Sequence, residues 1–236
     1  YWRAPTDNDR GNKMPDWAAV WRDAAAKRVA ERCEVSDRTE TSAAVIAELR
    51  LPAGESRARY AYVVHGSGAI EIETFFEPMG AKLPVVPRVG LLTELAPDWT
   101  NVAWYGRGPQ ECYWDRKSGA AVGLYRSTVR ELIYDYVEPQ ENGHRTDVRW
   151  MEITDTAGRG LRVTGLPLFG FNVWPYRQSD LEGPSHPWKM PRRELVTLCL
   201  DAAQMGVGGD NSWGARTHPD YCIQPGRPLT HRIRLE

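Results

Sequence analysis

The sequence predicts an all-β protein, a large antiparallel sandwich with one short helix near the N-terminus. Three observations support this prediction: many short segments rich in Val, Ile, Tyr, Phe and Trp, turn residues between them, and helical spacing in one segment alone. Strands that follow one another without intervening helices favour an antiparallel sandwich over a parallel sheet. The chain has 236 residues, a length that one all-β domain can reach. We therefore expect a single domain over residues 1–236.

The one predicted helix begins near Asp16, whose carboxylate can cap the first backbone N–H groups. The apolar residues after it recur at helical spacing, and they are Trp17, Val20, Trp21 and Ala24. Lys27 and Arg28 then end the apolar pattern.

The predicted strands are rich in β-branched and aromatic residues. Residues 70–74 and 229–235 alternate between apolar and polar side chains. The other candidates are residues 57–65, 88–95, 119–125, 130–137, 146–154, 168–174 and 194–200. Turn residues separate them at 66–68, 155–160 and 184–191, and we interpret the Pro-rich stretch 178–191 as a surface loop.

Charge and hydropathy exclude two classes of protein. The 30 Lys and Arg residues nearly balance 31 Asp and Glu residues, which leaves a net charge of −1. This balance provides no strong basic field, so we expect no nucleic-acid partner. Apolar runs such as residues 17–21 and 43–47 are far shorter than the roughly 20 residues that a membrane span needs. We therefore expect no membrane partner.

The pattern of Cys and His residues does not indicate a metal site. No pair among Cys33, Cys112, Cys199 and Cys222 has metal-ligand spacing, and no H-E-x-x-H motif is present. We expect free thiols in a reducing compartment, and hence a cytoplasmic protein. The chain starts at Tyr1 with no initiator Met and no signal-like segment, so we interpret it as an excised piece of a longer protein.

Two segments begin like known ligand-binding loops and then depart from them. Residues 7–12 begin like a calcium loop, but Asn12 stands where that loop needs Gly and Ala18 where it needs Glu. Residues 106–111 begin like a dinucleotide fingerprint, but Pro109 intrudes and Glu111 replaces the third Gly. We exclude both functions.

The aromatic composition favours a surface that binds flat, amphipathic ligands, sugars among them. There are 10 Trp and 10 Tyr residues but only 4 Phe. Trp and Tyr combine an apolar face with a polar tip, which suits such ligands. The alternative is that most of these rings fill a β core.

Four segments combine Gly, Asn and Asp with aromatic residues, namely residues 1–11, 104–116, 136–143 and 206–213. Each is typical of a polar turn whose residues tolerate positive φ. In one interpretation they are simply connections between strands, with Glu111 and Glu141 satisfying buried backbone groups.

In this order and spacing, the four segments resemble the C-terminal, small-chain domain of the β-galactosidases of glycoside hydrolase family 2. The resemblance covers nearly the whole chain. It implies a β supersandwich of the galactose-mutarotase type that belongs to a larger enzyme. The family's two catalytic glutamates lie in a separate (β/α)8 barrel, and no βα alternation occurs in this sequence. The resemblance therefore implies no catalytic residue here, and partners that include the barrel domain and a β-galactoside or its aglycone sugar.

The resemblance also implies roles for particular residues. The G-G-D-x-S-W motif ends at Trp213, which would stack on the aglycone sugar. The R-A-P-x-D-N-D-x-G motif would form a mobile loop at the mouth of the active site, with Arg3, Asp7, Asn8 and Asp9. The remaining positions would be architectural or near the cleft, and they are Glu111, Glu141, Asn142 and Asp210. No metal ligand or cofactor is implied in this chain, although the parent family uses Mg²⁺ and Na⁺ elsewhere.

Two other functions remain open from the residues. A stand-alone carbohydrate-binding module would use the same Trp and Tyr residues without the barrel. A mutarotase-like epimerase would need a base and an acid across one sugar, and Glu141 with His144 is the close pair available. We further expect residues 3–11 to be poorly ordered without the barrel, Tyr1 and Trp2 to be partly exposed, and Trp213 to lie partly exposed at one rim.

Overall fold

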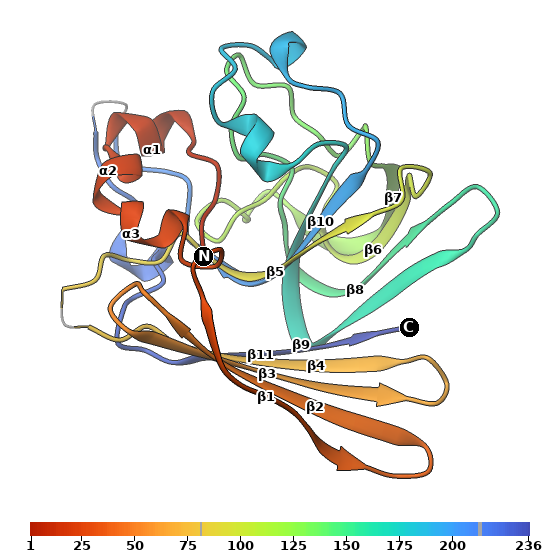
Figure 1. Ribbon diagram of the computed structural model, residues 1–236. Coiled ribbons are helices and arrows are strands. Elements are labelled where there is room, and N and C mark those ends of the chain that lie inside the picture. The colour runs from red at the N-terminus through yellow and green to blue at the C-terminus, as the bar shows by residue number, and fades with distance from the viewer. Residues whose placement is uncertain (81, 212–213) are drawn as a thin grey trace.

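The computed structural model describes residues 1–80, 82–211 and 214–236, and the strands in these ranges pair antiparallel throughout (Figure 1). This confirms the all-β antiparallel prediction. The strands are β1 (Val29–Arg38), β2 (Ser42–Leu51), β3 (Ser56–His65), β4 (Ile70–Glu77), β5 (Arg88–Leu95), β6 (Asn101–Gly108), β7 (Ala121–Thr128), β8 (Arg145–Thr154), β9 (Gly160–Trp174), β10 (Val196–Gln204) and β11 (Leu229–Leu235). None of the described helices is long and apolar enough to cross a membrane.

The long strand β9 joins the two parts of the sheet. The main path runs β1-β2-β3-β4-β11-β9-β8-β6-β7, and β10 pairs with both β9 and β5. The first half of β9 pairs with β11 near Val163, and its second half pairs with β10 near Phe171. Figure 1 shows β9 rising from the layer of β11, β4, β3, β2 and β1 toward β10 and β5. The chain thus folds into two layers that share β9.

The main core lies between the inward faces of β6, β8, β9 and β10. Trp104, Phe171 and Leu198 are each almost fully buried there. The Trp104 and Phe171 rings meet edge to face, with centroids 5.9 Å apart. Ile72 of β4 and Ile233 of β11 belong to the same buried cluster. Burying a large apolar side chain stabilises the folded state by about 1.5–3 kcal/mol, so this core holds the two layers together.

The N-terminal region forms three short helices instead of the one predicted. They are α1 (Asp7–Gly11), α2 (Met14–Trp17) and α3 (Ala19–Arg22). Asp16 lies inside α2 and caps nothing, because the N-cap of α2 is Lys13 at φ +62°. The true side-chain cap is Thr6, whose hydroxyl accepts the Asp9 N–H in a capping box.

A second core holds these helices against the sheet. Trp21 is fully buried and meets the Phe76 ring of β4 edge to face at 6.0 Å. Tyr1 is half-buried, which confirms its expected partial exposure, and its ring centroid lies 4.5 Å from that of Phe76. The expected exposure of Trp2 is wrong, because Trp2 is buried and its indole N–H donates to Glu182 Oε1 at 2.8 Å.

Most predicted strands are present, with one exception. Residues 130–137 form turns and irregular backbone between β7 and β8, not a strand. The predicted surface loop at 178–191 is confirmed. It contains the 3-10 helices η1 (Gln178–Leu181) and η2 (Pro187–Lys189), and the side chain of Trp188 is 77% exposed.

Candidate functional site

The four segments singled out in the sequence converge on one pocket of about 230 Å³. Each segment contributes to its wall, although they lie far apart along the chain. We call it the four-motif pocket, and it is lined by Thr6, Asp7, Asn8, Tyr113, Arg116, Tyr136, Gln140, Glu141 and Val207.

Arg3 and Asp9 attach the first segment to the fourth. The Arg3 guanidinium donates to both carboxylate oxygens of Asp9, at 3.0 and 2.9 Å, and both side chains are buried. Arg3 also donates to the carbonyls of Met205 and Gly206. The Asn8 side chain donates to the Val207 carbonyl at 3.0 Å. The expectation that residues 3–11 need the barrel as their packing partner is therefore wrong, because this chain's own 205–207 segment contacts them, while their poor order stays a prediction.

Gln140 attaches the third segment to the first. Its amide oxygen accepts the Asp7 backbone N–H at 3.0 Å, and its amide nitrogen donates to the Asp7 carboxylate at 2.9 Å. Arg10 adds a bond to the Pro139 carbonyl at 2.7 Å. Asp7 itself remains 66% exposed, and its second carboxylate oxygen accepts from the Arg10 guanidinium at 3.0 Å.

Glu111 serves as the connector between the second and third segments. One carboxylate oxygen accepts the Gly143 N–H at 2.7 Å, and the other accepts from Arg116 at 2.6 Å and from the Tyr136 hydroxyl. Burial, followed by the hydrogen bond to Glu111, raises the pKa of Tyr136 to about 12. Glu111 thus satisfies a backbone N–H, as the architectural interpretation expects.

Asn142 is also architectural. Its carbonyl accepts from Asn172 at 2.8 Å and from the Trp174 indole at 3.0 Å, while its side chain donates to the Gln140 carbonyl at 2.9 Å. These bonds fix the turn that carries Glu141 into the pocket.

Glu141 is the most chemically distinctive group in the four-motif pocket. It is 1% exposed, and Oε1 accepts from Asn172 at 2.7 Å. Among the described residues Oε2 has no hydrogen-bond partner, and the nearest cation is Arg88 at 3.6 Å. Burial raises the pKa of this carboxyl, against the opposing effect of Arg88. A buried carboxyl with a spare oxygen can accept a hydrogen bond from a ligand, or donate one when protonated.

His144 does not join Glu141 in this pocket. Its ring lines a separate cavity, and its Nδ1 lies 2.8 Å from Asn172 Oδ1. Burial lowers the pKa of His144 to about 4. The acid and base that an epimerase would need across one sugar therefore face different pockets.

The fourth segment is held by Asp115, which the sequence analysis did not single out. Its two carboxylate oxygens accept the N–H groups of Val207 and Gly208 at 3.0 and 2.7 Å. A Cβ at Gly206 would lie 2.5 Å from the Asp115 carboxyl carbon, which explains why glycine is required there. Asp115 thus fixes the backbone that leads toward residue 213.

Asp210, near the end of the fourth segment, does not line the four-motif pocket. Asp210 is exposed, pairs with His218 at 2.8 Å and lines a different cavity together with Trp17. Trp213, the predicted sugar-stacking residue, lies outside the described residues. In the described ranges no three His, Cys, Asp or Glu side chains are placed to hold a metal ion.

A sequence model of the family described as "Beta galactosidase small chain" matches residues 1–235. The chain belongs to this family. Three relatives are a β-galactosidase of Priestia megaterium, 37% identical over 236 residues, BgaC of Bifidobacterium adolescentis, 33% identical over 240 residues, and a β-galactosidase of Halalkalibacterium halodurans, 31% identical over 233 residues. The matches cover 97–100% of this chain but 23% of each relative. The small chain therefore spans about a quarter of the length of these relatives.

Two solved structures resemble this small chain more distantly. One is a putative aldose 1-epimerase of Escherichia coli K12, with 10% identity and a TM-score of 0.41 over 87% of this chain and 68% of that one. The other is the galactosidase domain of the α-galactosidase-sucrose kinase AgaSK, also with 10% identity and a TM-score of 0.41, over 89% of this chain and 27% of that one.

A group of buried polar side chains next to the four-motif pocket of the small chain was not predicted from the sequence. Arg88 of β5 makes two hydrogen bonds to the Asp201 carboxylate of β10, at 2.8 and 2.7 Å, and also donates to Asn172. Asn172 in turn donates to Glu141. The one signal available was a charged residue at each of positions 88 and 201, next to apolar strand residues. Arg88 and Asp201 thus hold Asn172 in place, and Asn172 holds the Glu141 carboxylate.

Proposed function

We propose that this small chain completes the aglycone side of the active site in a larger β-galactosidase, which hydrolyses terminal non-reducing β-D-galactose residues. The catalytic glutamates would come from a barrel domain outside this sequence. The small chain would supply no catalytic residue and would shape the site of the leaving sugar. Family membership together with the convergence of all four segments on one pocket supports this proposal.

The observation that carries the proposal is the double anchoring of the 205–208 segment. The Arg3 guanidinium donates to the Gly206 carbonyl of this segment. The Asp115 carboxylate accepts from the N–H groups of Val207 and Gly208. Five residues after Gly208 the sequence reaches Trp213. A residue that stacks on a sugar has to be presented from a rigid base, because an ordered platform loses less conformational entropy on binding. We propose that the anchored segment is this base and Trp213 the platform.

We also propose that the partners of this chain are the other domains of the parent enzyme and the aglycone sugar itself. Any Mg²⁺ or Na⁺ of the parent would be bound outside this chain.

The four cysteines, Cys33, Cys112, Cys199 and Cys222, are all free thiols, which supports a cytoplasmic location.

The test uses the full-length enzyme that carries this chain. Trp213→Ala should weaken binding of the aglycone sugar by about 1–2 kcal/mol, roughly 5- to 30-fold, because one aromatic contact is lost. Galactose binding beside the catalytic carboxylates should change little. The matched control is Trp188→Ala, which removes an indole that is 77% exposed and should leave aglycone affinity unchanged.

Two results would contradict the proposal. One is a Trp213→Ala enzyme whose melting temperature falls by many degrees while its affinity for the acceptor sugar is intact, which would make Trp213 a core residue. The other is turnover of a nitrophenyl β-galactoside by the purified 236-residue chain above a mock preparation, since the proposal gives this chain no catalytic pair.

A further inference from the structure

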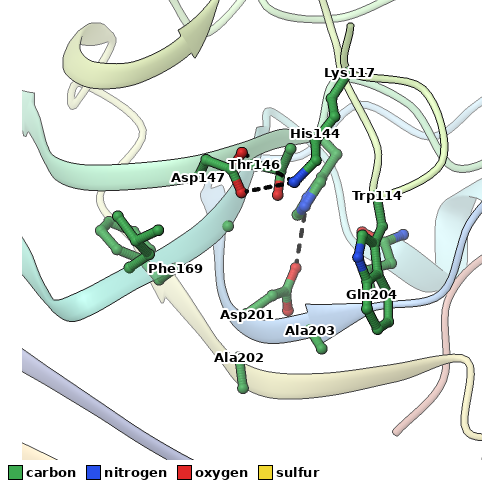
Figure 2. Close-up of a pocket in the computed structure, with 12 residues that line it drawn as sticks. Trp114, Lys117, His144, Thr146, Asp147, Phe169, Asp201, Ala202, Ala203 and Gln204 are labelled. Carbon is green, nitrogen blue, oxygen red and sulfur yellow. Dashed lines mark hydrogen bonds and ion pairs between the residues drawn. The ribbon is translucent and has the colours of Figure 1, made fainter. Parts of the chain in front are cut away.

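A second, smaller cavity of about 160 Å³ opens beside β8 and β10, and it is not the four-motif pocket (Figure 2). Figure 2 shows Trp114 beside Gln204 on one side of it, and Asp147 with Lys117 on another. Phe169 and Ala203 add apolar surface. The wall thus combines an aromatic ring, apolar carbons and several polar groups.

Gln204 in this wall has unused hydrogen-bonding capacity. The residue is 4% exposed, and neither its amide oxygen nor its amide nitrogen has a hydrogen-bond partner among the described residues. The Gln204 amide lies beside the Glu141 carboxyl and lowers its pKa, whereas burial, the larger effect, raises it. The two side chains do not have the geometry of a hydrogen bond. Burying an amide without partners costs free energy. A ligand in the cavity that both donates and accepts hydrogen bonds would remove that cost.

Asp147 is presented to the cavity by an irregular backbone. It has φ +55°, which non-glycine residues rarely adopt, and it lies where the register of β8 against β9 shifts. β-bulges of this kind re-aim side chains and occur often beside binding sites. The Asp147 carboxylate accepts hydrogen bonds from Lys117 Nζ at 3.0 and 3.2 Å and from Arg107 Nε at 2.6 Å.

The charges at the cavity are compensated. Lys117 faces the Asp147 carboxylate, and Asp201 is occupied by two hydrogen bonds from Arg88. A ligand with its own net charge would meet no unpaired opposite charge in this wall. A neutral ligand that carries many hydroxyl groups can use the donors and acceptors of Lys117, Asp147 and Gln204 at once.

The volume of the cavity and the indole of Trp114 narrow the range of possible ligands further. A cavity of about 150 Å³ is large enough to hold a six-membered ring. The indole of Trp114 is 37% exposed and offers an apolar face at the rim. Aromatic faces of this kind pack against the CH groups of a sugar ring. The volume of about 160 Å³ therefore admits one ring and excludes a disaccharide.

We propose that this cavity is a binding site for one neutral monosaccharide in its six-membered-ring form, held by Gln204 and Asp147 and covered by Trp114. The residues that line this cavity are all different from those that line the four-motif pocket. Every residue that lines the cavity belongs to this chain, so the 236-residue chain alone should bind the sugar.

The test titrates the 236-residue chain with D-galactose, D-glucose and D-galacturonate, followed by saturation-transfer NMR and indole fluorescence. At least one neutral sugar should bind in the millimolar range or tighter, and the anionic galacturonate should bind more weakly than galactose. Gln204→Leu should lower the affinity at least tenfold, with a melting temperature that is unchanged or higher, because the substitution removes a buried amide without partners. The matched control Gln110→Leu changes an exposed glutamine outside the cavity and should leave binding unchanged.

Trp114→Ala provides a second variant at the rim, where a change in folding is not expected. It should lower sugar affinity at least fivefold, while Trp188→Ala should not. The proposal is overturned if neither neutral sugar binds, if Gln204→Leu binds as well as the parent chain, or if Gln204→Leu lowers the melting temperature while affinity is kept. It is also overturned if binding survives Gln204→Leu and disappears in Trp213→Ala, a result that would leave the proposed aglycone role intact.

Discussion

The guanidinium of Arg3 donates two parallel hydrogen bonds to the carboxylate of Asp9, and solvent reaches neither side chain. The same guanidinium donates to the carbonyls of Met205 and Gly206, nearly the full length of the chain away. Arg3 therefore connects helix α1, through Asp9, to the backbone of the fourth segment. A point charge such as Lys could not make this set of planar contacts.

Arg3→Met should lower the free energy of unfolding by about 3–5 kcal/mol, because it leaves the Asp9 carboxylate buried without its partner. Urea unfolding of the 236-residue chain measures this change. The exposed pair Arg130–Asp135 gives the control, since its side chains are 72% and 53% exposed. Arg130→Met should cost no more than about 1 kcal/mol. Equal losses in the two variants would show that burial of the Arg3 pair has no energetic importance.

Gly143→Ala should destabilise the chain more than Gly158→Ala. Both glycines have positive φ, +75° and +79°, so an alanine pays a similar conformational cost at each. A Cβ at Gly143 would lie 2.7 Å from the Leu132 carbonyl oxygen, whereas at Gly158 it would meet nothing within 4 Å. We expect the Gly143 variant to lose about 1–3 kcal/mol more, as in other overpacked sites. Thermal unfolding of the two variants side by side measures the difference. Matching melting temperatures would show that the backbone near Leu132 yields without cost.

His144 should make stability fall as the pH is lowered. Its pKa in the folded chain is about 4, below the ordinary value of 6.5, so between these values the unfolded chain binds more protons. Stability from this group is therefore complete above pH 6.5 and is lost as the pH falls toward 4. Between pH 7.5 and 5 the loss should be about 2 kcal/mol. Glu141 acts in the opposite sense, because its raised pKa weakens the folded state as the pH rises.

The measurement compares the parent chain with His144→Gln by urea unfolding at both pH values. The variant should be destabilised less at pH 5 than at pH 7.5, because it cannot bind the extra proton when unfolded. His218→Gln is the control, since His218 is exposed and its pair with Asp210 is open to solvent. The prediction fails if His144→Gln shows the same destabilisation at both pH values.

The sequence predicted most of the strands that carry an apolar pattern, but it missed β2 and β6, although buried and exposed residues alternate along β6. Strands β5 and β11 occupy the predicted ranges, and β3 and β8 begin one residue earlier. β1 escaped detection because all ten of its residues are exposed, so no apolar periodicity marks it. Residues 130–137 were mistaken for a strand because Leu132 and Ile133 pack inward from turns. Local apolar content reports burial, and burial does not require strand geometry.

The four segments of the site were recognisable from sequence, but their assembly was not. The bonds from Arg3 to Gly206 and from Gln140 to Asp7 join residues far apart along the chain. No local pattern predicts which carbonyl a buried guanidinium reaches. The same limit applies to Glu141 and His144, which are three residues apart in sequence yet line different pockets.

The position of β11 has a consequence for biosynthesis. In the described chain β11 lies between β4 and β9, and no other described strand pairs with β4 on that side. As the ribosome extends the polypeptide, β1 to β4 can form a meander early, but the open edge of β4 then waits until residues 229–235 emerge. An unpaired edge recruits strands from neighbouring nascent chains. Slow translation or premature termination before residue 229 should therefore yield aggregates templated on β4, and the final strand acts as the closing step of folding in the cell.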